Sequence, residues 1–421
     1  MTDTAPAQYD LRLPDLVLEG GARVAPHVAR VWIHGPTDER DLLDGLGARV
    51  ASEPGTVVRR AAGEAPARPA SGALRLDPRV PTVLVIHALT GHAAPGGPQG
   101  WWSGVVGAGE PLDPTRHRIV SVALIGGCYG SSGPGDADFP RQTADRVVPG
   151  DHTKPTKGAF ALDATREPAT LTTWDQARAV LVALDHLGVE RLELVCGGSV
   201  GAMVAGCVAA LVPDRVARLG LFGGCTSASP WIVGFNHVGA QVVRALRDRG
   251  DATLGLALAR QLAMLTYRAE PSLEDRHPRV PPTAWRPGAP HRVETWLTHH
   301  GDKLVERFDA DAYLALLGAM SHHDLRRDPG LPQASESWRA FDGPPVARIR
   351  ASTVAVGIDT DQLYLPEHMH TFAAELAASG VVAFGRTLRS RHGHDAFLIE
   401  TPQVRAFLGE CLGLPPASLD L

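Results

Sequence analysis

The chain has 421 residues, a formal net charge of −5 and a hydrophobic content of 44%. This is enough for one large α/β domain with an insertion, or for two domains, each with a sizeable core. No basic block stands out, which argues against nucleic acid or an anionic membrane as the main partner, and no apolar run approaches the roughly 20 residues of a membrane-spanning helix.

The N-terminus and the cysteines indicate the compartment. Residues 1–4 (MTDT) lack the basic and then apolar pattern of a secretory signal. The five cysteines are an odd number, and most of them lie in apolar or glycine-rich stretches, as expected of buried thiols. We therefore expect a cytoplasmic protein in a reducing environment. No Cys/His spacing indicates a metal site, and none is predicted.

The first half of the chain alternates between strand and helix patterns. Residues 9–33 indicate an antiparallel pair of strands at a sheet edge. The continuous apolar runs at 81–87 and 119–124 are typical of strands buried on both faces. After them come a helix from Thr173 to a stop at Gly188, a strand from Leu192, a further helix, and a strand at 216–222. This alternation predicts a parallel sheet with helices on both faces.

The alternation stops after about residue 227 and returns with a strand at 353–356. The intervening segment indicates mainly helices, for example at 254–267 and 311–320. We expect it to form a helical lid inserted into the α/β core. The predicted organisation has three parts, which are a first core segment at 1–226, a lid at 227–348 and a second core segment at 349–421.

The strand that starts at Leu192 runs into the pattern Gly197-x-Ser199-x-Gly201. A serine at such a strand-to-helix bend projects its hydroxyl from the sheet, and the two glycines avoid clashes across the bend. The helix that follows directs its positive N-terminal end toward the charge that the serine generates. Ser199 is therefore the candidate nucleophile.

A serine hydroxyl needs a base within hydrogen-bond reach, and the base needs an orienting acid. In the α/β-hydrolase fold these follow in the order Ser, Asp or Glu, His. Two candidate acids, Asp359 and Asp361, follow the strand at 353–356, and two candidate bases, His392 and His394, follow the next strand. Both loops lie at the same sheet edge as Ser199, so the pattern predicts a triad and leaves each pair open.

Acyl transfer also needs donors for the oxyanion of the tetrahedral intermediate. The backbone N–H of Val200, directly after the nucleophile, is one candidate. The loop at 87–91 (HALTG) follows a buried strand, and the N–H of Leu89 is the second candidate. We expect His87 to be structural.

Several longer motifs resemble the homoserine O-acetyltransferase family, and the resemblance extends from about Leu13 to the end of the chain. They are residues 87–91 (HALTG), 100–102 (GWW), 126–134 (GGCYGSSGP), 197–201 (GGSVG), 235–236 (FN), 265–268 (LTYR), Lys303 with 307–310 (RFDA), and 393–398 (GHDAFL). They are far more specific than the five-residue serine motif alone.

The resemblance implies an α/β-hydrolase core with a helical lid, often dimeric through that lid. It implies transfer of an acyl group from acyl-CoA to the serine and then to an amino-acid hydroxyl, with no bound cofactor. It assigns the acid to Asp361 and the base to His394. It associates Asp395 with the substrate amino group, and we include Tyr267 from the LTYR motif among the substrate-binding candidates.

Two departures from the family pattern bear on the acceptor. Trp174 and Gly250 stand where the resemblance leads us to expect arginines, and the second of these would hold the substrate carboxylate. We predict that Arg249 substitutes from the neighbouring position.

The leading hypothesis is an O-acyltransferase that uses acetyl-CoA and homoserine, acting on small-molecule substrates as a homodimer. One alternative is the same machinery with another amino acid or a specialised-metabolite alcohol as acceptor. Another is an esterase in which water takes the acyl group. At this point acetyl and succinyl donors are both open.

Overall fold

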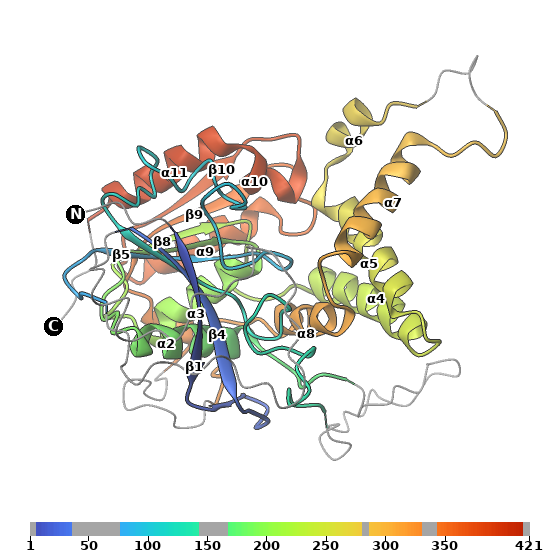
Figure 1. The fold of residues 1–421 in the computed structure, drawn as a ribbon. Helices are drawn as coiled ribbons and strands as arrows, with labels where there is room; N and C mark the ends of the chain where they lie inside the picture. Colours follow the sequence, from blue (N-terminus) through green and yellow to red (C-terminus); the bar gives the residue numbers. More distant parts are fainter. Residues whose placement is uncertain (1–5, 36–75, 143–166, 280–285, 331–342, 416–421) are drawn as a thin grey trace.

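The computed structural model describes residues 6–35, 76–142, 167–279, 286–330 and 343–415. Figure 1 shows an α/β body and a group of helices that projects from one side of it. Within the described ranges, no helix combines the length and apolar character needed to cross a membrane.

The body is built on one sheet of eight strands among the described residues. Its strand order is β1-β4-β6-β5-β7-β8-β9-β10. The strands are β1 (Ala7–Leu13), β4 (His27–His34), β5 (Thr82–Ile86), β6 (Arg118–Val122), β7 (Leu194–Gly198), β8 (Arg218–Phe222), β9 (Ser352–Ile358) and β10 (Ala383–Leu388). All neighbours from β6 to β10 are parallel, whereas β1 and β4 form the expected antiparallel pair at one edge. A separate short pair consists of β2 (Leu16–Val17) and β3 (Arg23–Val24).

Helices cover both faces of the sheet. One face carries α2 (Thr173–His186), α3 (Val200–Leu211) and α9 (Pro366–Ala378), and the other carries α11 (Thr401–Gly413) (Figure 1). In β5, Leu84 and Ile86 pack into the hydrophobic core on the face that carries α2, α3 and α9. Val83 and Val85 pack into the core on the face that carries α11. Because successive strand side chains point to opposite faces, a strand covered on both sides is apolar throughout. This confirms the mostly parallel α/β sheet predicted from the apolar runs.

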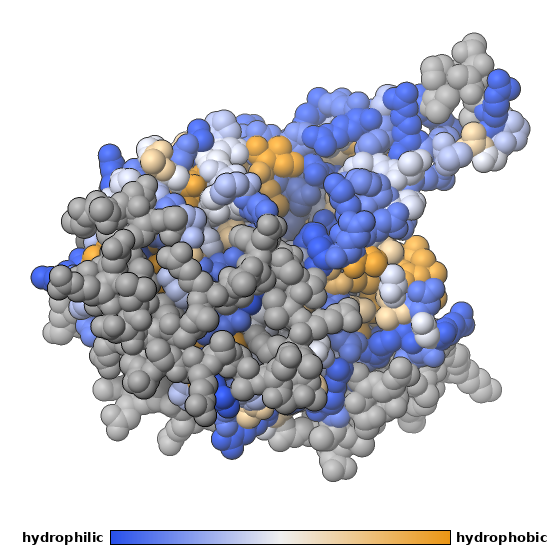
Figure 2. Space-filling model, viewed as in Figure 1, coloured by the Kyte–Doolittle hydropathy of each residue, from blue (hydrophilic) through white to orange (hydrophobic). Residues whose placement is uncertain are grey.

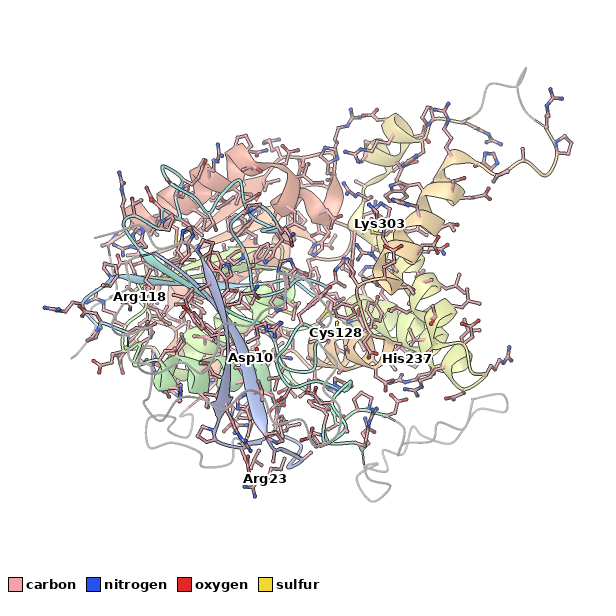
Figure 3. All side chains as sticks on the ribbon, in the orientation of Figure 1. Asp10, Arg23, Arg118, Cys128, His237 and Lys303 are labelled. Atoms are coloured by element: carbon pink, nitrogen blue, oxygen red, sulfur yellow. The ribbon has the colours of Figure 1, made fainter. Side chains whose placement is uncertain are left out.

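Five α-helices lie between β8 and β9 in the described part of the chain. They are α4 (Pro230–Arg247), α5 (Ala252–Tyr267), α6 (Glu270–Arg276), α7 (Arg292–Val305) and α8 (Ala310–Ser321). Figure 3 places His237 on α4 and Lys303 on α7, away from Asp10 in the sheet, and Cys128 between the two parts. Helix α8 instead packs on the body, because Ala315 and Ala319 are buried in a cluster that contains Ala179 of α2.

The second half of the core returns after the short helix η4 (Pro345–Arg348). Beyond β10, the chain forms η5 (Gly393–Asp395) and α10 (Ala396–Ile399) before α11. Strand β10 begins only at Ala383, because the backbone N–H groups of Gly380 and Val381 still bond to the last turn of α9. All five cysteines are free and buried, as their sequence context predicts.

Candidate active site

Ser199 occupies the bend between β7 and α3 in a conformation that few residues adopt. Its φ of 57° makes it the one non-glycine residue with positive φ in the described ranges. A Cβ on Gly201 would lie 2.3 Å from the carbonyl oxygen of Ile86, and one on Gly197 would lie 2.7 Å from the same atom. The bend therefore requires glycine on both sides of the serine. Strain of this kind, typically about 1–3 kcal/mol, persists where the surrounding structure enforces it, often at active sites.

His394 and Asp361 form a buried, hydrogen-bonded pair. Nδ1 of His394 donates to Oδ2 of Asp361 at 2.6 Å. The other carboxylate oxygen, Oδ1, accepts from the backbone N–H groups of Leu363 and Tyr364 at 2.8 and 2.9 Å. With both oxygens engaged, the carboxylate fixes the orientation of the imidazole and leaves Nε2 for a substrate or nucleophile.

Burial and the carboxylate act in opposite directions on the pKa of His394. Burial lowers it, whereas the charge and the hydrogen bond of Asp361, with a contribution from Asp395, raise it, and the net result is a raised pKa. A base whose protonated form is stabilised in this way accepts a proton more readily during the reaction.

The competing residues found in the sequence have other contacts. Oδ1 of Asp359 accepts the backbone N–H of Ser390 at 2.9 Å, which ties the loop after β9 to the loop after β10. Nδ1 of His392 lies 3.0 Å from Oγ of Ser272 in α6. The geometry therefore groups His394 with Asp361, and Asp359 and His392 support the loops around them.

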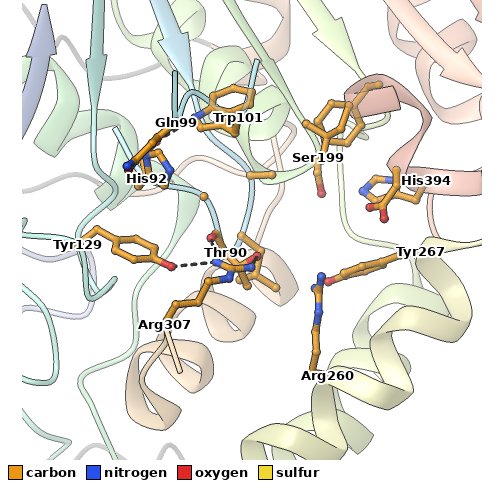
Figure 4. A pocket seen from close by; sticks show the side chains of 16 residues that line it. Thr90, His92, Gln99, Trp101, Tyr129, Ser199, Arg260, Tyr267, Arg307 and His394 are labelled. Carbon is orange, nitrogen blue, oxygen red and sulfur yellow. Dashed lines mark hydrogen bonds between the residues drawn. The ribbon is translucent and has the colours of Figure 1, made fainter. Parts of the chain in front are cut away.

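Ser199 and His394 share a cavity of about 460 Å³ at the carboxyl ends of the parallel strands. Its wall comes from the loop after β5, from Tyr129, from the helices between β8 and β9, and from the loop after β10. Figure 4 shows a ring nitrogen of His394 facing the hydroxyl of Ser199, with Tyr267 and Arg260 below them. The candidate nucleophile and the candidate base thus lie beside the same cavity.

Of the two candidate oxyanion donors, one lies in the cavity wall and the other directly follows Ser199 in the chain. Leu89 lies in its wall, in the loop directly after β5. Val200 is the first residue of α3, so its N–H is among the first four of the helix, which have no acceptor within it. The positive end of α3 adds a favourable field for a negative charge at Ser199.

Asp395 and Tyr267 line the cavity, as expected for substrate-binding residues. The ring of Tyr267 lies 5.8 Å from that of His394, centroid to centroid. Oδ2 of Asp395 lies 3.3 Å from Nε of Arg268, a neighbour that the sequence analysis did not assign.

Arg249 lies outside the cavity. It is exposed in the turn between α4 and α5, and the 16 residues of α5, about 24 Å of helix, separate it from Tyr267. Gly250 lies in the same turn with a φ of +89°, a conformation that favours glycine. The structure therefore does not bring Arg249 to the cavity that Ser199 and His394 share.

Two other arginines line the cavity, Arg260 and Arg307. Arg260 stacks on Tyr267, with its Cζ 5.2 Å from the ring centroid. The two residues are seven positions apart in α5, which places them on one helix face, and that spacing was the signal in the sequence. Arg307 donates to the carbonyl oxygen of Thr90 and to the hydroxyl of Tyr129 (Figure 4).

Trp174 is also remote from the cavity wall. It is fully buried in α2, and its Nε1 donates to the carbonyl oxygen of Asp324 at 3.2 Å. Its difference from the family pattern is therefore a matter of core packing and removes no charge from the cavity.

Comparison with known proteins agrees with this architecture. The sequence profile of the alpha/beta hydrolase fold family matches residues 81–387. A homoserine O-acetyltransferase from Thermus thermophilus is 38% identical over 351 residues, which cover 77% of this chain and 80% of that protein. Other curated relatives of the same name are 32–37% identical.

Solved structures match over nearly the whole chain. Homoserine O-acetyltransferase from Bacillus anthracis superposes with a TM-score of 0.71 at 16% identity, covering 99% of this chain and 100% of that one. Esterase E22 superposes with a TM-score of 0.70 at 16% identity, covering 97% and 100%. At this identity the structures show a common fold. From the identity to its curated relatives, the chain belongs to the homoserine O-acetyltransferase family, within the alpha/beta hydrolase fold.

Proposed function

We propose that this protein transfers an acetyl group from acetyl-CoA to the hydroxyl of L-homoserine by a ping-pong mechanism. One observation carries the proposal: Ser199, His394, two arginines and Asp395 line one cavity, and Asp361 bonds to the ring of His394. The identity of the chain to proteins named homoserine O-acetyltransferase supports this choice of donor and acceptor.

In the first half-reaction, Oγ of Ser199 attacks the thioester carbonyl while Nε2 of His394 takes its proton. The oxyanion that forms is held by the N–H groups of Leu89 and Val200. Collapse of the intermediate breaks the carbon–sulfur bond, and His394 returns the proton to the departing CoA thiolate. Acetyl-Ser199 and free CoA result.

In the second half-reaction, the homoserine hydroxyl takes the place that CoA has left. His394 removes its proton as the oxygen attacks the acetyl carbonyl, and then protonates Oγ of Ser199 as the ester to the enzyme breaks. Arg260 offers its guanidinium to the acceptor carboxylate, and Asp395 offers its carboxylate to the ammonium. Opposite charges in one cavity suit a zwitterionic amino acid.

We further propose that the helices between β8 and β9 act as the lid of this site, within a segment spanning residues 227–348. Tyr267 and Arg260 from α5, and Arg307 after α7, contribute to the cavity wall. A covered site excludes water, which would otherwise take the acetyl group. Retention of the acyl group thus depends on these helices.

Acetyl-CoA alone separates a transferase from a hydrolase. We expect about one equivalent of CoA per site to be released in a burst, followed by slow turnover, and an acetyl adduct on Ser199 by intact mass. Addition of L-homoserine restores rapid CoA release. Fast release without an acceptor would identify a hydrolase. A parallel series with succinyl-CoA tests the choice of donor.

We also propose a homodimer in the cytoplasm, formed through α4 and α5. Both helices expose large apolar side chains, and Figure 2 shows apolar surface over this part of the molecule. The side chain of Trp231 is 59% exposed, and those of Leu254 and Leu265 are each 44% exposed. Exposed apolar patches of this kind are typical of interfaces. Leu254→Glu should convert a dimer to a monomer in light scattering. A wild-type monomer would refute the proposal.

A further inference from the structure

His87 is a buried histidine that the proposed mechanism does not use. It follows β5 directly and is 3% exposed. Its Nε2 accepts the backbone N–H of Leu124 at 3.0 Å, so that nitrogen carries no proton. The proton of the neutral ring is therefore on Nδ1, which donates to the carbonyl oxygen of Ala88 at 2.7 Å. Burial lowers the pKa of His87 to about 4, which keeps this neutral tautomer at neutral pH.

The acceptor of that hydrogen bond belongs to the same peptide unit as the N–H of Leu89, the candidate oxyanion donor. The carbonyl of Ala88 and the N–H of Leu89 are two ends of one peptide unit, which is planar and trans. In a trans peptide the C=O and the N–H point in opposite directions. Whatever fixes the Ala88 oxygen therefore also fixes the direction of the Leu89 N–H.

The Ala88 oxygen is held from two sides. Besides Nδ1 of His87, the backbone N–H of Gly91 donates to it at 2.9 Å. The turn leaves no room for a side chain at that glycine, since a Cβ there would lie 2.9 Å from Cβ of His87. Both lone pairs of the carbonyl oxygen are thus occupied, and the loop is closed tightly around the imidazole.

We propose that His87 is a positioning residue that aims the Leu89 N–H at the oxyanion. It links the end of β6, through Leu124, to the peptide that donates to the reacting carbonyl. The inference rests on the proposed acyl-transfer function, in which Leu89 supplies one of the two donors. An oxyanion donor must be in place before the charge develops, because a donor that reorients during the reaction contributes less.

Two variants separate the hydrogen bonds of His87. The amide of asparagine can place an N–H near the position of Nδ1, and that of glutamine can place an acceptor near the position of Nε2. His87→Asn therefore keeps a donor for Ala88, and His87→Gln keeps an acceptor for Leu124. We expect kcat of His87→Asn to fall only a few-fold and that of His87→Gln to fall about 10- to 100-fold, below the loss seen when an oxyanion donor is removed outright. KM for acetyl-CoA should be unchanged in both.

His323 provides the matched control. It is also buried, its pKa is also lowered to about 4, and both its ring nitrogens are engaged, by Thr173 and by the carbonyl oxygen of Cys225, but it lies outside the cavity wall. His323→Gln should lower the melting temperature about as much as His87→Gln and leave kcat near wild type. Equal losses of kcat in His87→Asn and His87→Gln, or losses that follow the melting temperature across all three variants, would overturn the proposal.

The acylation rate with p-nitrophenyl acetate keeps this test separate from the proposed function. That ester acylates a serine nucleophile whatever the natural donor is, and its oxyanion needs the same N–H groups. If the wild type reacts with the ester but not with acetyl-CoA, the proposed function fails, and the order of the His87 variants still decides the inference.

Discussion

Asp361 and His394 meet at 2.6 Å across 33 positions of sequence. Each follows a strand of the parallel sheet, β9 for the acid and β10 for the base, and these two strands are neighbours. The backbone N–H groups of Leu363 and Tyr364 hold the carboxylate from the side away from the imidazole. The carboxylate therefore holds the imidazole through Nδ1 and leaves Nε2 unengaged by Asp361, beside the cavity that Ser199 also lines.

Exchanging each candidate acid for its amide should separate the catalytic acid from the structural one. Asp361→Asn should lower kcat by about 10³- to 10⁴-fold, because the amide no longer stabilises the protonated imidazole or enforces its tautomer. Asp359→Asn should cost little, since an amide oxygen still accepts the N–H of Ser390. Steady-state kinetics with acetyl-CoA and homoserine measure both. Comparable losses would remove Asp361 from its assigned role.

The pH dependence of acylation should follow the raised pKa of His394. The imidazole accepts the serine proton only when it is neutral, so kcat/KM for acetyl-CoA should rise as the pH increases through a value above the ordinary 6.5. In Asp361→Asn the raising charge is gone while the burial remains, so the residual activity should appear at lower pH. Asp359→Asn should keep the wild-type profile. If kcat/KM of Asp361→Asn rose over the same pH range as that of the wild type, this account would be contradicted.

Arginine substitutions before α5 and within it test which residue binds the acceptor carboxylate. Arg260→Gln should raise KM for L-homoserine by about 10-fold or more, since a charge-assisted bond in a partly desolvated cavity is lost. The size of the acetyl-CoA burst should stay the same. Arg249→Gln should behave as wild type, because that side chain is exposed in the distant turn.

The matching experiment measures turnover of an acceptor that lacks the carboxylate, such as 3-amino-1-propanol. The wild type should use this amino alcohol poorly, and Arg260→Gln should discriminate little between it and homoserine. An equal loss on both acceptors would mean that Arg260 supports the fold of the lid rather than the carboxylate.

Acid should destabilise this protein through its buried histidines. Burial lowers the pKa of His87 and of His323 from 6.5 to about 4. Between these values the unfolded chain binds more protons than the folded one. The contribution of each histidine to the free energy of unfolding is therefore fully present above pH 6.5 and is lost as the pH falls toward 4. Each such group contributes on the order of 3 kcal/mol. The free energy of unfolding, measured in urea from pH 7.5 to 5, should decrease as the pH falls. The slope of this free energy against pH should be shallower in His323→Gln. A slope identical to wild type would refute the assignment for that residue.

Local sequence was sufficient wherever short-range sterics decide the structure. Gly197 and Gly201 determine a bend around Ser199, because a Cβ on either glycine would clash with the carbonyl oxygen of Ile86. The uninterrupted apolar run of β5 determines a strand covered on both faces, because its side chains alternate between two cores. These two features, with the chain order of acid and base, predicted the α/β sheet and placed the candidate triad at one edge of it.

The local pattern left residues of the same type open; the family resemblance chose between them, and only the tertiary structure supplied the contacts that distinguish them. Asp359 and Asp361 lie two positions apart in one loop, and His392 and His394 in another, so their roles depend on how the loops pack against each other and against α6. The sequence pointed to Arg249 and not to Arg260, whereas in the structure Arg249 is exposed before α5 and Arg260 within α5 stacks on Tyr267. Hydrogen bonds and ion pairs act over a few ångströms, and those distances between remote segments exist only once the sheet has formed and the helices have packed on it.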